Sequence, residues 1–289
     1  MRAQRRRSRA AALVAACALA AGAFAAAPSI ASADDAGSLT AAAGAVQATL
    51  TWGTAEFGVA DPRLVIVRAG ATAFDGSPVA NSDGCRDGYC SFLPSGKRTS
   101  ALQVVDLNGD GEPEVLVDAY TGGAHCCAVT ELAAFNGSGY AIQELEWGNT
   151  GYELQDLDRD GKPEFVGFDD AFAGAFSSFA ASFFPPRVVD YDPGVEGALR
   201  DVTDHFPALI RKNQRSALHA LSRARRQHYE TLGIVAAYVA DFYLVGDPGH
   251  ARPYLKRARK RGDLRTISGR APRSYERRLL AFLKKHGYR

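Results

Sequence analysis

A nine-residue acidic motif occurs twice in this chain, fifty positions apart. It begins at Asp106 as Asp-Leu-Asn-Gly-Asp-Gly-Glu-Pro-Glu and at Asp156 as Asp-Leu-Asp-Arg-Asp-Gly-Lys-Pro-Glu. Oxygen-bearing side chains at alternate positions can converge on one point only if the chain then turns sharply, which Gly111 and Gly161 permit. Calcium takes roughly six to eight such oxygen ligands. The motif therefore predicts a pair of calcium loops, and two calcium ions, on two similar hairpins.

The expected ligands occupy alternate positions of each motif, with a backbone carbonyl at position 7 and carboxylates or an amide at positions 1, 3, 5 and 9. They are Asp106, Asn108, Asp110, Glu112 and Glu114 in the first loop, and Asp156, Asp158, Asp160, Lys162 and Glu164 in the second. An EF-hand would need a carboxylate at position 12, where the chain has Val117 and Gly167. The alternative is an acidic turn that binds no metal. The recurrence of the same alternation favours calcium.

The first 33 residues are typical of a signal peptide. They combine five arginines at the start, an apolar run rich in alanine, and Ala31-Ser32-Ala33 before Asp34. We therefore expect a secreted protein without a membrane span. An alternative is a lipid anchor at the cell surface through Cys17, because Val14-Ala15-Ala16-Cys17 resembles a lipobox.

Charge divides the remaining chain into two parts. Residues 34–199 contain 25 acidic and 8 basic side chains, whereas residues 200–289 contain 7 acidic and 21 basic ones. Such an asymmetry indicates two regions with different partners, or two regions that bind each other.

Four cysteines remain after the signal peptide: Cys85, Cys90, Cys126 and Cys127. An even number in an exported chain predicts disulfides. We favour a Cys85–Cys90 bridge, with Cys126 and Cys127 bonded either to each other or across to the first pair. A zinc site that uses these thiols with His125 is the alternative, although adjacent cysteines suit a tetrahedral site poorly.

The region 48–199 has the pattern of short strands. Residues 34–47 are small and rich in alanine and glycine, so we expect a flexible leader there. Each motif lies among short apolar segments, which in the first copy are 102–105, 115–118, 128–135 and 140–147. A period of about fifty residues with four short strands is typical of a propeller blade.

These features resemble the FG-GAP/VCBS-type calcium-binding repeats of secreted and cell-surface proteins. The resemblance covers about residues 100–195 and depends on the two loops and on the Gly-Ala turns that follow them. It implies calcium-stabilised β-structure that often serves adhesion or ligand display, and it does not imply an enzyme. Two repeats and an N-terminal half-repeat cannot close a propeller, so we expect an α+β chain with an incomplete propeller or an open sheet or sandwich.

Five phenylalanines lie close together after the second loop: Phe172, Phe176, Phe179, Phe183 and Phe184. Their spacing suits one helical face, whereas the repeat alignment predicts strand and turn. They can form an aromatic platform for a glycan or fill the core beneath the second repeat. Large apolar clusters are usually buried, so we favour the core.

Residues 200–289 are predicted to form a basic helical domain, with three or four helices that include 230–244 and 274–285. Arginines and lysines crowd the exposed faces. They can be a solvated surface, or they can face an anionic partner, either the acidic β-region or a cell-wall polymer such as teichoic acid or an acidic glycan. No nucleic-acid-reading motif is present, so we do not expect a nucleic-acid partner.

No catalytic signature accompanies these features: the chain has no Gly-x-Ser-x-Gly, His-Glu-x-x-His or Walker sequence. Three functional classes remain. The first is a non-catalytic calcium-dependent binding, adhesion or cell-surface module, which we favour. The second is a calcium-stabilised secreted hydrolase, possibly acting on glycans. The third is a structural partner of another exported protein.

Overall fold

The computed structural model describes residues 36–56, 58–79, 85, 89–96, 100–123, 126–195 and 198–289, with backbone alone at 123 and 126. The predicted signal peptide and Cys17 lie outside the described residues. All described residues belong to one compact unit, Ser32–Arg289. Within them, no helix is long and apolar enough to span a bilayer.

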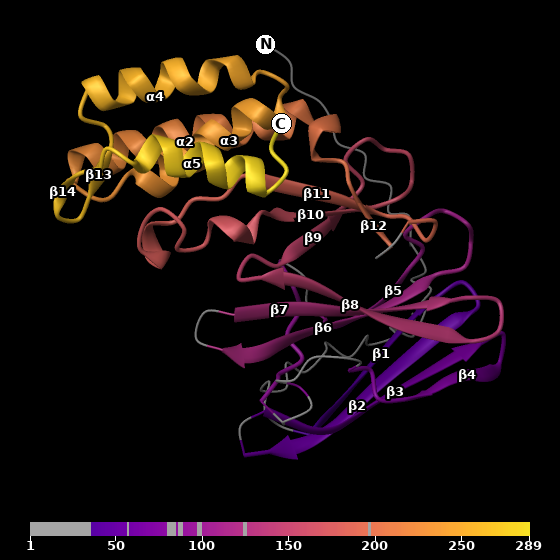
Figure 1. Ribbon diagram of the computed structural model, residues 1–289. Helices are drawn as coiled ribbons and strands as arrows, with labels where there is room; N and C mark the ends of the chain where they lie inside the picture. Colours follow the sequence, from indigo (N-terminus) through magenta and orange to yellow (C-terminus); the bar gives the residue numbers. More distant parts are fainter. Residues whose placement is uncertain are drawn as a thin grey trace, which may run out of the picture. The chain divides into compact units, whose positions relative to one another are not determined.

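Twelve strands form three antiparallel sheets of four, each a meander in which neighbours along the chain pair with each other (Figure 1). The first sheet contains β1 (Gly37–Ala43), β2 (Val46–Ala55), β3 (Gly58–Arg68) and β4 (Ala71–Gly76). The second contains β5 (Leu102–Val105), β6 (Glu114–Gly123), β7 (Cys126–Phe135) and β8 (Tyr140–Gly148). The third contains β9 (Tyr152–Gln155), β10 (Glu164–Phe168), β11 (Pro186–Tyr191) and β12 (Leu199–Asp201). No sheet closes on itself in the part of the chain that the structure describes.

The N-terminal segment differs from the sequence expectation. Residues 34–47 were expected to be a flexible leader, but β1 occupies most of this segment and pairs along its whole length with β2, from Gly37 opposite Trp52 to Ala43 opposite Val46. Leu39 and Ala41 pack on the buried cluster of the first sheet. Small side chains suit this edge because a Cβ at residue 37 would collide with the Trp52 ring. The expected half-repeat is therefore a full four-stranded sheet.

The second and third sheets reproduce the fifty-residue repeat. β5 begins at Leu102 and β9 at Tyr152, and the partner strands begin at Glu114 and Glu164. The hairpins close in the same register, with Val105 opposite Glu114 and Gln155 opposite Glu164. Both acidic motifs thus connect two antiparallel strands, as the sequence predicted.

The two sheets differ after their second strands. Where the second sheet continues directly into β7, the third is interrupted by two 3-10 turns, η1 (Asp170–Phe172) and η2 (Phe179–Ala181). The aromatic segment is therefore neither the helix nor the strand that its pattern suggested. Phe172 is fully buried and meets Phe282 edge to face at 5.1 Å between ring centroids. Phe172 is buried as expected, but it packs with the C-terminal helices and not beneath the second repeat, and Phe179 is 37% exposed.

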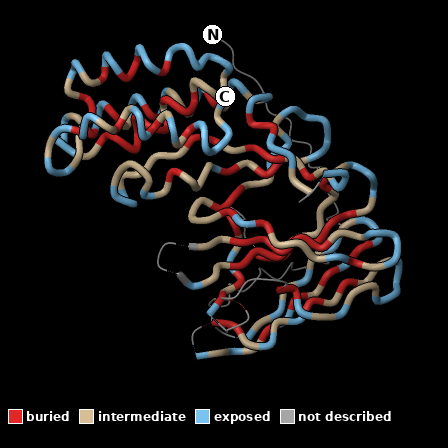
Figure 2. Tube along the Cα trace, in the orientation of Figure 1, coloured by how far each residue is buried: buried red, intermediate tan, exposed pale blue. Residues whose placement is uncertain are grey.

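The C-terminal part is helical, as the sequence predicted. It contains α2 (Pro207–Arg226), α3 (Leu232–Leu244), α4 (Ala251–Lys260) and α5 (Tyr275–Lys285). Short elements connect them: η3 (Thr203–His205), η4 (Pro248–His250), β13 (Arg265–Thr266) and β14 (Gly269–Arg270). Figure 2 shows exposed and buried residues alternating along α4, whereas most residues of α3 are buried.

Aromatic packing, and not ion pairing, joins this helical part to the aromatic segment. Phe172 and Phe176 belong to the same apolar cluster as the helices, and Phe176 meets Tyr275 at 5.8 Å. Tyr238 and Phe242 of α3 pack instead on Tyr254 of α4. Within the described residues, no ion pair connects α2–α5 with residues 36–199.

Candidate metal centre

The two acidic loops share one backbone conformation. Position 4 is left-handed in both, with φ of 72° at Gly109 and 67° at Arg159. Position 6 is also left-handed, with φ of 84° at Gly111 and 90° at Gly161. An arginine rarely adopts such a φ, so its presence at position 4 indicates that the surrounding loop imposes this turn.

Backbone N–H groups hold the carboxylates of the second loop in place. Asp156 accepts hydrogen bonds from the N–H groups of Asp160 and Gly161, both at 3.1 Å. Asp158 accepts from Asp160 N–H at 3.1 Å, and Asp160 accepts from Lys162 N–H at 2.8 Å. These bonds turn the three side chains towards the inside of the loop.

The same pattern holds in the first loop. Asp106 accepts from the N–H groups of Gly109 at 2.7 Å and Gly111 at 2.9 Å. Asn108 accepts from Asp110 N–H at 3.1 Å, and Asp110 accepts from Glu112 N–H at 2.8 Å. In each loop, the loop's own N–H groups therefore hold the predicted side chains at positions 1, 3 and 5.

The second loop has the donor set that fits calcium better. One carboxylate oxygen from each of Asp156, Asp158 and Asp160 lies within 4.8 Å of the others, and all three residues are exposed. In the first loop, Asn108 replaces the middle carboxylate, and its Nδ2 donates to Asp110 Oδ2 at 2.9 Å. A calcium ion would displace that hydrogen bond, because it needs oxygen and not nitrogen at this place.

The glutamates at position 9 are buried at the base of both hairpins. Glu114 accepts from Leu107 N–H at 2.9 Å and Glu164 accepts from Leu157 N–H at 2.7 Å. Burial removes water from the carboxylates, which raises the pKa of Glu114 to about 7 and also raises the pKa of Glu164. Each glutamate therefore closes its hairpin through the residue at position 2, in addition to the ligand role that the sequence predicted for it.

The side chains at position 7 of the two loops make different contacts. Glu112 forms a two-pronged ion pair with Arg68 of β3, with Nε–Oε1 at 2.7 Å, and the Arg68 guanidinium lies 4.3 Å from the centre of the Phe135 ring. Lys162 lies with Nζ 4.0 Å from Asp160 Oδ2. In both loops the backbone carbonyl remains the group that position 7 offers to a metal.

The two loops are neighbours in space. A Cβ placed on Gly109 would lie 3.1 Å from Cε of Lys162, so the first loop touches the second. Both contribute to a cavity of about 290 Å3 that also includes β11 and the residues next to it. Asp190 and Asp192 face this cavity and form ion pairs with Arg200 at 3.3 and 3.7 Å. Repetition of the motif thus places two candidate metal loops side by side.

The predicted Cys85–Cys90 disulfide is present. Cys127 is also disulfide-bonded, whereas His125 and the side chain of Cys126 lie outside the described residues. Three of the four thiols are therefore committed to sulfur bonds, which contradicts the zinc alternative because zinc needs free thiolates.

A buried polar cluster escaped the sequence reasoning. Asp118 is 1% exposed and accepts from Thr130 Oγ1 at 2.7 Å and from the Tyr152 hydroxyl at 2.9 Å. Trp147 Nε1 donates to Thr130 Oγ1 at 2.9 Å. The cluster connects the second sheet to the first strand of the third. No local pattern separates a buried aspartate in a strand from an exposed one, so only its partners reveal it.

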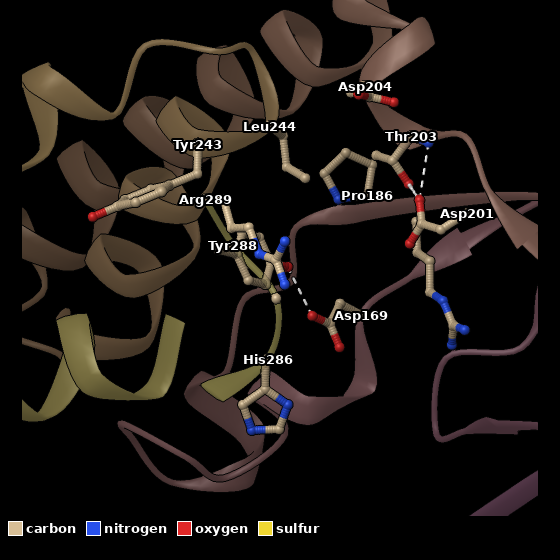
Figure 3. A pocket seen from close by; sticks show the side chains of 12 residues that line it. Asp169, Pro186, Asp201, Thr203, Asp204, Tyr243, Leu244, His286, Tyr288 and Arg289 are labelled. Carbon is tan, nitrogen blue, oxygen red and sulfur yellow. Dashed lines mark hydrogen bonds between the residues drawn. The ribbon is translucent and has the colours of Figure 1, made fainter. Parts of the chain in front are cut away.

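A second pocket, of about 520 Å3, lies where the C-terminus meets the third sheet (Figure 3). Tyr288 donates to Asp169 Oδ2 at 2.7 Å, and Thr203 donates to Asp201 Oδ1 through both its N–H and its hydroxyl. Figure 3 shows the Tyr288–Asp169 pair near the centre of the view and the Thr203–Asp201 pair to its right. The residues that line this pocket lie far apart in the sequence, so no local motif predicted it.

Comparisons with known proteins give partial matches. The chain is 35% identical over 154 residues to a protein of Synechocystis sp. strain PCC 6803 named "Probable thylakoid lumen protein", a match that covers 50% of this chain and 44% of that protein. It is 33% identical over 75 residues to "Uncharacterized protein y4bJ" of Sinorhizobium fredii, covering 26% of this chain and 12% of that protein. The chain thus matches less than half the length of either relative.

No family model matches the sequence, and no solved structure matches it. The evidence on function therefore comes from the two loops and their strands.

Proposed function

We propose that this protein is an exported calcium-binding repeat protein of the FG-GAP/VCBS type, and that it serves as a non-catalytic binding, adhesion or cell-surface module. The observation that supports the proposal most is the convergence of Asp156, Asp158 and Asp160, in a loop whose backbone turn recurs fifty residues earlier. Two calcium ions would bind, one in each loop. The three sheets would pack as blade-like units of an incomplete propeller.

Calcium would act as a structural cofactor. An empty loop places several carboxylates within a few ångströms of one another, and their repulsion opposes folding. An ion that binds only the folded loops stabilises the protein by about 2.7 kcal/mol per site at a concentration one hundred times Kd. The chain's own contribution is to orient the ligands, through the N–H donors of the loop and through Glu114 and Glu164 at its base.

Export is supported by the signal-peptide pattern and by the name of the cyanobacterial relative, which refers to a lumenal protein. The Cys85–Cys90 disulfide fits an oxidising compartment. A secreted protein and one anchored through Cys17 remain the two forms of this proposal, and the mass of the mature N-terminus distinguishes them.

Calorimetric titration and thermal unfolding, each with calcium and with chelator, test the proposal. We expect two binding events and a higher melting temperature with calcium. Asp110→Ala and Asp160→Ala should each remove one event, because each deletes the ligand at position 5. Absence of binding heat together with an unchanged melting temperature would overturn the calcium proposal.

A calcium-stabilised hydrolase is the second candidate. The pocket in Figure 3 favours it, because Asp169, Asp201 and Asp204 line a cavity outside both loops. Asp204 is the carboxylate to test, since Asp169 and Asp201 already hold Tyr288 and Thr203. If Asp204→Asn abolishes turnover of a polysaccharide substrate while calcium still binds, the enzyme alternative is correct.

A further inference from the structure

Several cations of α4 and α5 face one common groove. Four of them, together with Arg273 just before α5, line one shallow groove of about 680 Å3 between the two helices; the five are Arg252, Lys256, Arg273, Arg277 and Lys284. All five are exposed. The floor of the groove is apolar and contains Leu255, Leu280 and Ala281.

The acidic side chains nearby are all engaged elsewhere. Glu276 is the one carboxylate in the groove, and it accepts from Arg259 Nε at 2.6 Å, a contact that joins α5 to α4. Asp263 pairs with both Arg225 and Arg261. Within residues 198–289, which the structure describes completely, none of the five groove cations has an acidic partner within 4 Å.

Within residues 198–289, the groove cations lack carboxylate partners, as do Arg257 and Lys260 elsewhere on α4, whereas two other arginines on or beside this helix are paired. Arg259 and Arg261 on and beside α4 have carboxylate partners, whereas Arg252 and Lys256, one turn apart on its groove face, have none. Like charges repel in this arrangement, and a bound anion relieves that repulsion. The groove therefore has the charge of a site that an anion completes.

We propose that the α4–α5 groove binds a linear phosphodiester polymer without bases, such as a poly(polyol phosphate). The cations form two rows instead of one focus: Arg277 and Lys284 are seven residues apart, which is about 10 Å along a helix. Spaced charges fit a chain with repeated anions better than a single small anion. Arginine guanidiniums bind phosphate oxygens through paired N–H groups, and three of the five cations are arginines.

Two other polyanions fit the groove less well. Helices that lie on membranes present large apolar side chains to the lipid, but none of the exposed large apolar residues in the described chain lies in α4 or α5. Single-stranded nucleic acid binds grooves that offer aromatic rings for stacking, but the lining of this groove has no aromatic residue. A polymer recognised only through its phosphates needs neither feature.

The test measures binding of fluorescently labelled poly(glycerol phosphate) to the full chain by anisotropy over a range of salt concentrations. The variant is Arg277→Gln with Lys284→Gln. The matched control is Arg278→Gln with Lys285→Gln, which removes the same charge from the next position of the same helix, outside the groove. Thermal unfolding of all proteins shows that each variant folds.

We expect the groove variant to bind about 10- to 30-fold more weakly, because each of the two lost cations contributes roughly a three- to fivefold step at an anionic surface. The salt dependence should also become shallower by about one to two counterions. The control should bind like the wild type, and chelator should leave the binding unchanged, since the groove lies apart from the calcium loops.

Three results would overturn the proposal. Equal losses in the groove variant and its control would indicate a diffuse basic surface. Tighter binding to anionic vesicles, or to a single-stranded oligonucleotide of the same charge, would assign the groove to a membrane or to nucleic acid. Absence of binding by the wild type at low salt would remove the site altogether.

Discussion

The first acidic hairpin and the second have the same turn but different charges on it. Both close with a buried glutamate that accepts the N–H of position 2, at 2.9 Å for Glu114 and 2.7 Å for Glu164. In the first, an amide replaces one carboxylate, whereas the second brings three carboxylates together. The shared closure indicates that the fold of the hairpin depends on backbone N–H donors, while the charge on it would set the affinity of the proposed metal site.

The two hairpins also differ in how strongly neighbouring residues hold them. Glu112 ties the first hairpin to β3 through Arg68, and this ion pair holds it without a metal. The second hairpin carries Lys162 at that position, with only a 4.0 Å approach to Asp160. We therefore expect the second hairpin to depend more on calcium than the first.

The largest effect on stability is expected at Asp241, because this carboxylate, unlike those of the hairpins, does not accept hydrogen bonds from several N–H donors. Asp241 of α3 is fully buried, and its Oδ2 accepts one hydrogen bond, from Asn213 Nδ2 at 3.0 Å, whereas Oδ1 has no partner. Burial raises the pKa of Asp241 to about 8. The folded state thus binds a proton more tightly than the unfolded state, and stability falls as the pH rises from about 4 to about 8.

Asp241→Asn should remove this pH dependence and stabilise the protein by about 2 to 4 kcal/mol at pH 8. The amide keeps an oxygen for Asn213 and carries no charge. Denaturant unfolding at several pH values measures the effect, and the variant should match the wild type below pH 4. If the free energies of unfolding of wild type and variant change with pH in the same way between pH 4 and pH 8, the buried carboxylate of Asp241 is not the cause of the pH dependence. Asp241 could then no longer serve as the example of a buried carboxylate with few hydrogen-bond donors, against which the hairpin carboxylates are compared.

Both hairpins and two of the helices could be predicted from the sequence. The alternation of acidic residues around Gly111 and Gly161 predicted two equivalent hairpins, and the strands around them, because a turn with φ > 0 and a period of two leave few other structures. The apolar spacing in 230–244 and 274–285 likewise predicted α3 and α5 to within two residues.

Other features depend on contacts that no local pattern contains. β1 looked like a flexible leader because alanine and glycine carry no strand signal, and it becomes a strand by pairing with β2. Phe172 had helical spacing, yet its conformation follows from packing on Phe282 of α5. The Arg68–Glu112 pair joins positions 44 residues apart, and no local pattern connects them.

The next effect concerns the glutamates that close the hairpins. Glu114→Ala and Glu164→Ala should each destabilise the metal-free protein by about 1 to 3 kcal/mol, because each leaves a buried N–H without an acceptor. Glutamine at either position keeps the acceptor, so stability in chelator should stay close to that of the wild type while calcium binding weakens. Denaturant unfolding and calorimetry separate the two quantities. Equal instability of the glutamine and alanine variants would contradict the shared closing role.

Exchanging the middle ligands tests the charge difference directly. Asn108→Asp should strengthen calcium binding in the first loop by roughly tenfold and lower the melting temperature in chelator, since it adds a repelling carboxylate. Asp158→Asn should do the opposite in the second loop. Calorimetric titration of both variants measures the exchange. If neither affinity changes, the ligand at position 3 does not account for the difference between the loops.

The smallest effect is expected at position 4, where the loops share a backbone conformation but not a residue. Arg159 has φ of 67°, a value that glycine adopts without strain and that an L-residue adopts only at a cost. Arg159→Gly should therefore stabilise the protein by about 0.5 to 1 kcal/mol, with calcium affinity almost unchanged because no ligand is altered. The matched control is Gly109→Ala, which should destabilise because it combines the same φ with a close approach to Lys162. Denaturant unfolding in chelator measures both, and a destabilised Arg159→Gly variant would mean that the two hairpins do not share the turn on which their comparison depends.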